Sequence, residues 1–217
     1  MPEPESSSEE SSRDAAQTGG QAPSPRKVGD KELVHIAGAG TIGMTILLVS
    51  LSILFVASIV AYLVIRHQSF MWPPPGFPHV PETLWLSTFI ILLASVTIQL
   101  AMNAVRRDDH RRLTKYLFWT FCAGVAFLIL QTISWIDFYR AIERSAQLQG
   151  AYLGMFFVLT GLHAAHVIGG LIPLGIVYSR AKRERYSRNY HPGVRYVTAY
   201  WHFLDVIWVA LFLVLYF

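Results

Sequence analysis

The stretch Tyr152–Ile172, YLGMFFVLTGLHAAHVIGGLI, decides the fold of this chain. It is long enough to cross a bilayer as a helix, because about 20 apolar residues rising about 1.5 Å each span the hydrocarbon core. It carries two imidazoles, His163 and His166, whose spacing puts them about 60° apart on one side of that helix. Because polar groups inside a membrane are costly, we expect this helix to be central and packed by protein rather than by lipid. A row of small residues that would let another helix approach closely supports this. Its members are Gly154, Gly161, Ala165 and Gly169.

The whole chain has the composition of an integral membrane protein. It is 53% hydrophobic, only 15% of its residues are charged, and the charges cluster between apolar runs. Its formal charge of +4 therefore reflects membrane topology rather than nucleic-acid binding. The single cysteine, Cys122, excludes an intrachain disulfide and a cysteine-rich metal site.

Five apolar runs predict an all-α fold, a polytopic bundle of five transmembrane helices within residues 36–217. Pro173 should kink the end of the fourth helix. Residues 1–35 are rich in Ser, Glu, Pro and Gly and cannot bury enough apolar surface to order themselves, so they predict a disordered tail. This tail also lacks the apolar segment of a signal peptide. The expected spans are about 41–65, 84–105, 116–138, 151–178 and 197–217.

The basic residues predict the orientation of these spans. Three of them, Arg66, Arg140 and Arg144, fall on one side of a five-span protein, and the other fifteen fall on the opposite side. By the positive-inside rule the N-terminus and the tail are cytoplasmic and the C-terminus is outside. The fifteen are Arg13, Arg26, Lys27, Lys31, Arg106, Arg107, Arg111, Arg112, Lys115, Arg180, Lys182, Arg183, Arg185, Arg188 and Arg195.

Three histidines are candidate ligands for haem or copper, since imidazole suits both metals. They are His163, His166 and, near the start of the fifth span, His202. No carboxylate or cysteine lies beside the first two in sequence to orient them as ligands. We therefore favour hydrogen bonding between helices over metal binding.

Asp205 lies one to two turns inside the membrane, three residues after His202. An ionisable group at that depth indicates a functional role by default. The alternative, which we favour, is that His202 or His166 neutralises it and the pair locks two helices together. We predict that His163, His166 and Asp205 form one buried polar cluster between the fourth and fifth spans, because an unpaired charge there would cost several kcal/mol.

Four further side chains are candidates for structural or lipid contacts. Trp201 is expected to anchor the helix at the membrane interface, and Gln131 to hydrogen-bond between helices. Arg66, beside Tyr62 at the outer end of the first span, should meet lipid phosphate or a partner carboxylate. Nothing in the sequence resembles a nucleophilic triad, a phosphate-binding glycine loop or a paired-carboxylate site, so we expect no active site on this chain.

The runs FFVLTGLHAAHVIGG and YWHFLDVIWVALF resemble the C-terminal half of subunit III of haem-copper oxidases. The resemblance covers roughly residues 40–217 in a five-span form of that family. Upstream it is carried by GMTILLVSLSILFVASIVAYLVIR, WPPPGFP, SVTIQLAMNAVRR and GVAFLILQ.

This resemblance implies a non-catalytic subunit III of a proton-pumping terminal oxidase in aerobic respiration. Such a subunit packs on subunit I in a complex with subunit II, binds phospholipid, and supports proton uptake and stability during turnover. Haem and copper would lie on those partner subunits and no cofactor on this chain. The expected location is a bacterial inner membrane.

Two positions depart from the family pattern. The family usually has a Ser-Glu pair in the first of these spans, and this chain has Ser50 and Leu51. The family often has a Glu before the tryptophan of the third span, and this chain has Ser134 before Trp135. Both changes put in doubt a proton-linked role for these positions.

Three alternatives to the oxidase subunit remain open from the sequence. The chain is an accessory membrane subunit of a nitric oxide reductase, a haem-binding membrane anchor that uses its three membrane histidines, or a lipid-binding scaffold outside the oxidases. The sequence also leaves open whether cytochrome c or quinol donates electrons to the complex.

Overall fold

The computed structural model describes residues 30–70, 83–144 and 151–216. Within these residues each of the five helices contains a segment long and apolar enough to cross a membrane. The predicted all-α architecture of five membrane helices is thereby confirmed. The helices are α2 (Asp30–Gln68), α3 (Thr83–Arg106), α4 (His110–Arg144), α5 (Ala151–Lys182) and α6 (Pro192–Tyr216).

Most helices extend beyond the apolar runs that predicted them. α2 begins at Asp30 rather than near residue 41, and α4 covers His110–Arg144 rather than 116–138. An apolar run marks the thickness of the hydrocarbon core, whereas the backbone hydrogen bonds of a helix continue into the headgroup region, where charged side chains are solvated. Residues 30–35 of the predicted tail are helical, and its remainder lies outside the described residues. Pro173 lies inside α5 and does not end it.

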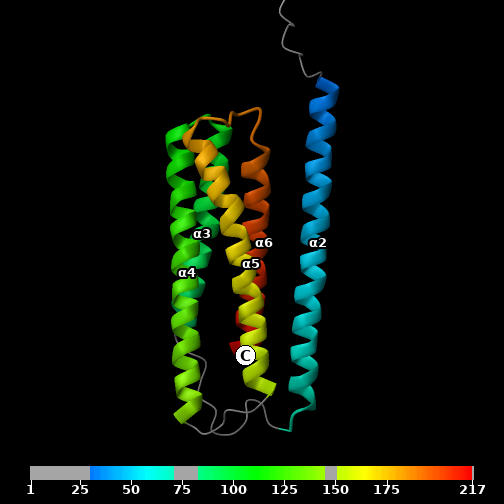
Figure 1. Ribbon diagram of the computed structural model, residues 1–217, viewed down its shortest axis with the longest axis vertical. Helices are drawn as coiled ribbons and strands as arrows, with labels where there is room; N and C mark the ends of the chain where they lie inside the picture. Colours follow the sequence, from blue (N-terminus) through cyan, green and yellow to red (C-terminus); the bar gives the residue numbers. More distant parts are fainter. Residues whose placement is uncertain (1–29, 71–82, 145–150, 217) are drawn as a thin grey trace, which may run out of the picture. The chain divides into compact units, whose positions relative to one another are not determined.

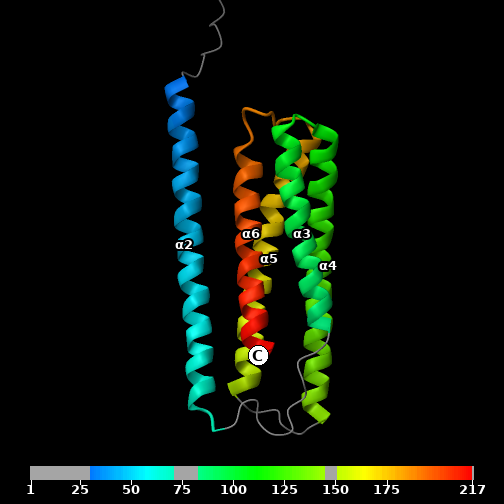
Figure 2. The same ribbon diagram turned by 180° about the vertical axis from the view of Figure 1, so that it is seen from behind.

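The chain divides into two units at Ala39, and the first contributes only the start of α2 to the described residues. In the second unit α4 packs against both α3 and α5, and so does α6 (Figures 1 and 2). The part of α2 from Gly40 onward meets α5 and α6 through side chains. The ring of Phe55 packs edge-on against that of His166, 5.2 Å between centroids, and the Arg195 guanidinium donates to the Thr41 hydroxyl at 2.6 Å.

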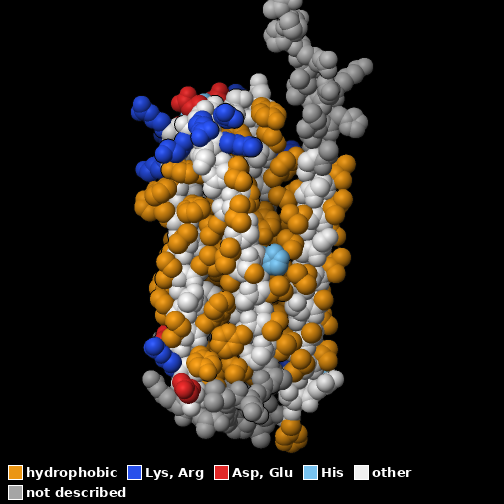
Figure 3. Space-filling model, in the orientation of Figure 1, with side chains coloured by type: hydrophobic (Ala, Val, Ile, Leu, Met, Phe, Trp, Pro, Cys, Tyr) orange, Lys and Arg blue, Asp and Glu red, His pale blue; other side chains and the backbone are white. Residues whose placement is uncertain are grey.

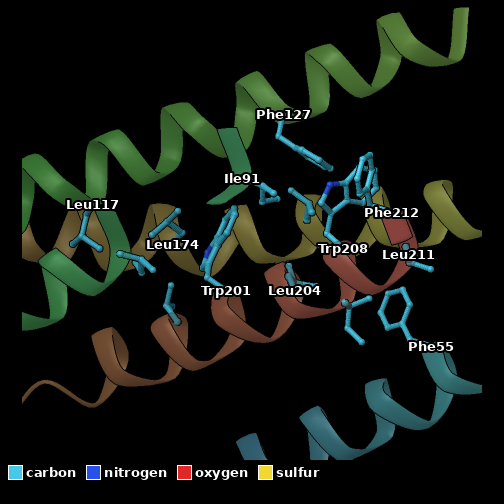
Figure 4. Packing of buried hydrophobic residues seen from close by; sticks show 14 of the residues in the cluster. Phe55, Ile91, Leu117, Phe127, Leu174, Trp201, Leu204, Trp208, Leu211 and Phe212 are labelled. Carbon is cyan, nitrogen blue, oxygen red and sulfur yellow. The ribbon is translucent and has the colours of Figure 1, made fainter. Parts of the chain in front are cut away.

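The core is aromatic and centres on α6. Trp201 and Trp208 are buried, and Trp208 meets Phe127 of α4 edge to face at 4.8 Å between ring centroids (Figure 4). In the most hydrophobic 18-residue segment of α6, 50% of the residues are buried, whereas 39% are buried in the corresponding segment of α5. The most enclosed helix is thus α6, and not the span Tyr152–Ile172 that the sequence indicated. Large rings on α6 fill the space between helices, whereas α5 leaves large aliphatic side chains such as Ile168 and Ile172 more than half exposed.

The closest helix contacts involve glycines outside the predicted row. A Cβ added to Gly124 would lie 2.6 Å from a ring carbon of Trp201, and one added to Gly170 would lie 2.6 Å from a ring carbon of Tyr200. At two members of the predicted row an added Cβ would meet nothing within 4 Å. Those members are Gly154 and Gly161. The row is therefore not the line along which α5 packs within this chain.

The turn between α3 and α4 shows how a short sequence reverses the chain. Asp108 adopts a left-handed φ of 59°, while its N–H donates to the Val105 carbonyl and the N–H of Asp109 donates to the Ala104 carbonyl. These two bonds satisfy the carbonyls at the end of α3. The Asp109 carboxylate then accepts from the Arg112 N–H at 2.9 Å and caps α4.

We expect Gly170→Ala to destabilise the chain, because its methyl group would lie 2.6 Å from a ring carbon of Tyr200. Overpacking of this kind costs about 1–3 kcal/mol. Thermal unfolding of the detergent-solubilised protein, followed by size-exclusion chromatography, should show a lower midpoint. Gly161→Ala is the matched control on the same helix and should keep or raise the midpoint, since Ala favours a helix by up to about 1 kcal/mol over Gly. Equal midpoints would contradict the packing described here.

Candidate functional site

His163 lies in a cage of aromatic rings. Its imidazole is fully buried, with its centroid 4.9 Å from that of Trp208, 5.7 Å from Phe127 and 6.3 Å from Phe55. Figure 4 shows these three rings, which come from α6, α4 and α2. Neither imidazole nitrogen has a hydrogen-bond partner among the described residues. Within this chain His163 therefore acts as a packed ring rather than as a link between helices.

His166 and Asp205 do not join it in a hydrogen-bonded cluster. The Nδ1 of His166 bonds to the Leu162 carbonyl of its own helix at 2.7 Å. Asp205 is only 4% exposed, and neither carboxyl oxygen has a hydrogen-bond partner within the described ranges. No hydrogen bond therefore links these three side chains within the described residues, and the one buried polar cluster that the sequence predicted stays a prediction. The spacing along α5 placed the two histidines on one side of the helix, but it did not show which neighbour each would face.

The polar link between spans runs through His202 instead. Its Nδ1 lies 2.8 Å from the Ser95 hydroxyl and its Nε2 lies 3.0 Å from Oε1 of Gln99, both on α3. Since a carbonyl oxygen only accepts, Nε2 carries a hydrogen, and the Nδ1 of a neutral ring then accepts the Ser95 hydrogen. The sequence reasoning missed Ser95 and Gln99. Their four-residue spacing, which puts both on one face of α3, is the signal that would have identified them.

Asp205 and His202 line a hollow of about 460 Å³ between α3 and α6. The Ser95 hydroxyl lies beside the carboxyl of Asp205. It has one hydrogen, however, and cannot donate to His202 and to Asp205 at once. The carboxyl of Asp205 therefore keeps unused capacity to accept hydrogen bonds. The remaining residues that line the hollow are Leu92, Val206 and Val209.

Trp201 and Gln131 both lie in the core of the bundle. Trp201 is fully buried against Gly124, so the prediction that it anchors the helix at the interface is wrong. Its position, about 13 Å along α6 from Pro192, is too deep for the headgroup region. Gln131 is also buried, and neither of its amide atoms has a hydrogen-bond partner in the described part of the chain. The predicted bond from Gln131 to another helix is therefore not made there.

Shorter side chains make the hydrogen bonds between helices in this region. The indole N–H of Trp208 donates to the Thr88 hydroxyl at 3.0 Å. The Ser134 and Thr83 hydroxyls lie 2.7 Å apart and join α4 to α3. Ser134 thus has a structural partner at a position where the family often carries an acid. Leu51, at the other such position, is half-buried on α2.

At the C-terminal end of α2, Arg66 reaches the last turn of α6. Its guanidinium donates to the Val214 carbonyl at 3.5 Å. Tyr62 is buried one turn earlier, and Tyr152 of α5 interacts electrostatically with both of these residues. These contacts join α2 to the rest of the second unit. A lipid phosphate or partner carboxylate on Arg66 stays a prediction.

No three His, Cys, Asp or Glu side chains gather as a candidate metal site in residues 30–70, 83–144 and 151–216. Of the predicted histidines, His163 packs among rings, His166 bonds to its own helix, and His202 bonds to α3. The placement of haem and copper on other subunits stays a prediction.

We expect His163→Phe and His202→Phe to act in opposite directions. His163 has no hydrogen bond to lose, so Phe removes buried polar nitrogens and should leave stability unchanged or raise it by about 1 kcal/mol. His202→Phe removes the hydrogen bonds to Ser95 and Gln99 and should lower stability by about 1–2 kcal/mol. Thermal midpoints of both solubilised variants against the parent measure the difference. If His163→Phe were the more damaging change, the nitrogens of His163 would have a partner outside the described chain.

The comparisons with known proteins agree along the length of the bundle. A family model described as cytochrome c oxidase subunit III matches residues 28–217. The cytochrome c oxidase subunit 3 of Thermostichus vulcanus is 31% identical over 176 residues, which cover 81% of this chain and 85% of that protein. The protein of the same name from a Synechocystis species is 32% identical over 176 residues, which cover 80% of this chain and 73% of that protein. The cytochrome c oxidase subunit 3 of Bos taurus is 33% identical over 147 residues, which cover 67% of this chain and 54% of that protein.

Proposed function

This chain belongs to the cytochrome c oxidase subunit III family, and we propose that it is the non-catalytic subunit III of a proton-pumping haem-copper oxidase in aerobic respiration. The observation that carries the proposal is the family match over residues 28–217, which takes in all five described helices. The chain is a multi-pass membrane protein, and members of its family are subunits of a membrane oxidase.

The arrangement of its polar side chains supports a structural role. The described polar groups pack singly among rings, bond to their own helix, or join neighbouring helices, as His163, His166 and His202 do. They do not converge as nucleophile, acid and base would have to converge for catalysis. We expect haem and copper on the partner subunits and no cofactor on this chain.

Its outer surface supports contact with lipid and with other subunits. Only 17% of the most hydrophobic 18-residue segment of α2 is buried. Most of the surface of this segment is therefore available to phospholipid or to a partner helix. We propose that the chain packs on subunit I in a complex with subunit II, binds phospholipid, and supports proton uptake and stability during turnover.

We propose a bacterial inner membrane as its location, with the N-terminus in the cytoplasm. Lys and Arg side chains gather at the end of the bundle where α4 begins and α5 ends, while the apolar middle of the same face carries none (Figure 3). That distribution is the one expected of cytoplasmic loops.

Reporter fusions test this orientation. Alkaline phosphatase folds only outside the cytoplasm, so a fusion after Tyr216 should be active. A fusion after Glu184, in the loop between α5 and α6, is the matched control and should be inactive. The reverse pattern would invert the topology.

The function itself is tested by purifying the tagged full chain from its native membranes in mild detergent. We expect two larger subunits to co-purify, together with a reduced-minus-oxidised haem spectrum and cytochrome c or quinol oxidation coupled to oxygen uptake. Nitric oxide reduction without oxygen reduction would identify the chain as an accessory subunit of a nitric oxide reductase. A Soret band from the chain purified alone would favour the haem-binding anchor and overturn the proposal.

We expect Leu51→Glu to weaken insertion or packing modestly without improving turnover. An acid in a membrane span is costly, and the described structure pairs Ser134, the second family position, with Thr83 instead of with an acid. Oxygen consumption and proton release by vesicles that contain the variant complex measure the effect. A higher pumping ratio or a longer lifetime during turnover would show that the site still supports an acid. Carbodiimide labelling of the parent should fall on Asp205, or on Asp137 at the end of the third span, and on no residue of 41–65.

A further inference from the structure

A separate hollow opens between the start of α4 and the end of α5. Its volume of about 480 Å³ lies within the range of about 300–1,000 Å³ that is usual for small-molecule sites. Three basic side chains line it, Arg111 and Lys115 from α4 and Lys182 from α5, and all three are exposed. Glu184 is the one carboxylate among the described residues that line it. We call this site the cationic hollow.

The cationic hollow has more positive than negative charge, and nearby acids do not compensate for the difference. None of its three basic side chains forms an ion pair within the described residues, with Glu184 or with any other acid. The Asp109 carboxylate is already paired with the Arg112 guanidinium at 3.2 Å. The Asp108 carboxylate accepts the Arg188 N–H at 3.0 Å. The hollow is therefore suited to an anion from outside the chain.

The wall of the hollow changes from charged to aromatic toward the middle of the bundle. Phe118 lies within the apolar run of α4, about 10 Å along the helix from Arg111. It is 45% exposed, and its ring centroid lies 6.1 Å from that of Tyr178 on α5. Lys182 follows Tyr178 by one turn, with its Nζ 5.7 Å from the centroid of the Tyr178 ring. Figure 3 shows the same change on the face as a whole, from Lys and Arg at this end to apolar side chains below.

This gradient favours a phospholipid over other anions. A free phosphate ion would meet the basic side chains and leave Phe118 and Tyr178 without an apolar partner. An acidic peptide segment that reached these rings would bring unbonded backbone groups to the edge of the hydrocarbon core. A phospholipid places its phosphate at the level of the basic residues and its acyl chains at the level of the rings. An anionic headgroup fits better than a zwitterionic one, because a zwitterionic headgroup brings a cation of its own.

We propose that the cationic hollow binds the headgroup of an anionic phospholipid, with the phosphate among Arg111, Lys115 and Lys182. The acyl chains then run along Phe118 and Tyr178, so that one lipid bridges α4 and α5. This inference rests on the phospholipid binding in the proposed function, and it adds the site and the charge of the headgroup.

Lipid retention by the tagged full chain, purified with its complex, tests the site. The protein is reconstituted into vesicles of phosphatidylethanolamine and phosphatidylglycerol in equal amounts and extracted again in mild detergent, and its retained lipids are measured by mass spectrometry. We expect the parent to retain phosphatidylglycerol preferentially. Arg111→Gln with Lys115→Gln should lower that retention at least about tenfold, since each basic residue near an anionic surface contributes about fivefold.

The matched control removes the same charge from the same end of the bundle but outside the hollow. It is Arg106→Gln with Arg107→Gln, two exposed residues at the end of α3 and just beyond it. The control should retain phosphatidylglycerol as the parent does. Equal losses in the two double variants would show a general effect of surface charge and would overturn the site. Equal retention by the Arg111→Gln/Lys115→Gln variant and the parent, the result expected if an acidic protein segment fills the hollow, would overturn it too.

Two further measurements keep the test decisive. If the α4 double variant fails to accumulate, Lys182→Gln on α5 replaces it and should lower phosphatidylglycerol retention about fivefold. Inorganic phosphate, added during the second extraction to the parent, should leave the lipid in place at a constant ionic strength. Displacement by inorganic phosphate would identify a site for phosphate alone and overturn the assignment to a phospholipid.

The site and the proposed function fail separately. If the parent chain brings down the oxidase but the two double variants retain equal phosphatidylglycerol, the site is wrong and the oxidase assignment stands. If the parent brings down no haem protein, the oxidase assignment is wrong, and lipid retention by the chain still decides whether the site exists.

Discussion

The absence of water within a bilayer is the constraint on which the rest of this structure depends. Every backbone N–H and C=O in the hydrocarbon core must be bonded within the protein, which leaves long helices as the only solution for this chain. The same constraint acts on hydroxyl side chains. Ser52, Ser58 and Thr132 each donate to the carbonyl four residues earlier on their own helix, at 2.8 Å in each case. Polar residues can therefore sit on lipid-facing surfaces of a span without requiring a partner helix.

The helices could be predicted because hydropathy is a property of the sequence alone. The packing could not be predicted in the same way, because it depends on how each helix is rotated about its axis relative to its neighbours. The row containing Gly154 and Gly161 was a reasonable prediction, yet Gly170 is the residue that faces a ring on α6. His163 and His166 do lie on one side of α5, but 60° is enough to send one into an aromatic cage and the other onto its own backbone. Helical periodicity restricts which residues share a face and does not identify what that face meets.

The tryptophans illustrate a related limit. Trp is common at both membrane interfaces, so a tryptophan near the start of a span, such as Trp201, indicates an anchor on statistical grounds. In this chain Trp201 fills the space above Gly124, and Trp208 both packs on Phe127 and donates to Thr88. Whether a tryptophan is an anchor or a core residue depends on the residue that it faces. Trp201 faces Gly124 and Trp208 faces the Thr88 hydroxyl, and both of these partners lie on other helices. The family resemblance supplied the function that the residues of the site could not, because the described polar groups mostly stabilise the bundle.

The polar atoms that remain unbonded within the described residues differ in one respect that matters. Gln131 and Asp205 are both buried and both lack hydrogen-bond partners. Gln131 is an uncharged amide, whereas Asp205 carries an ionisable carboxyl, and the energetic penalty for leaving a charge unpaired is much larger. Asp205 also lines the hollow between α3 and α6, although both of its carboxyl oxygens are shielded within the bundle. The Ser95 hydroxyl beside this carboxyl also bonds to His202, so the imidazole and the carboxyl compete for one hydrogen.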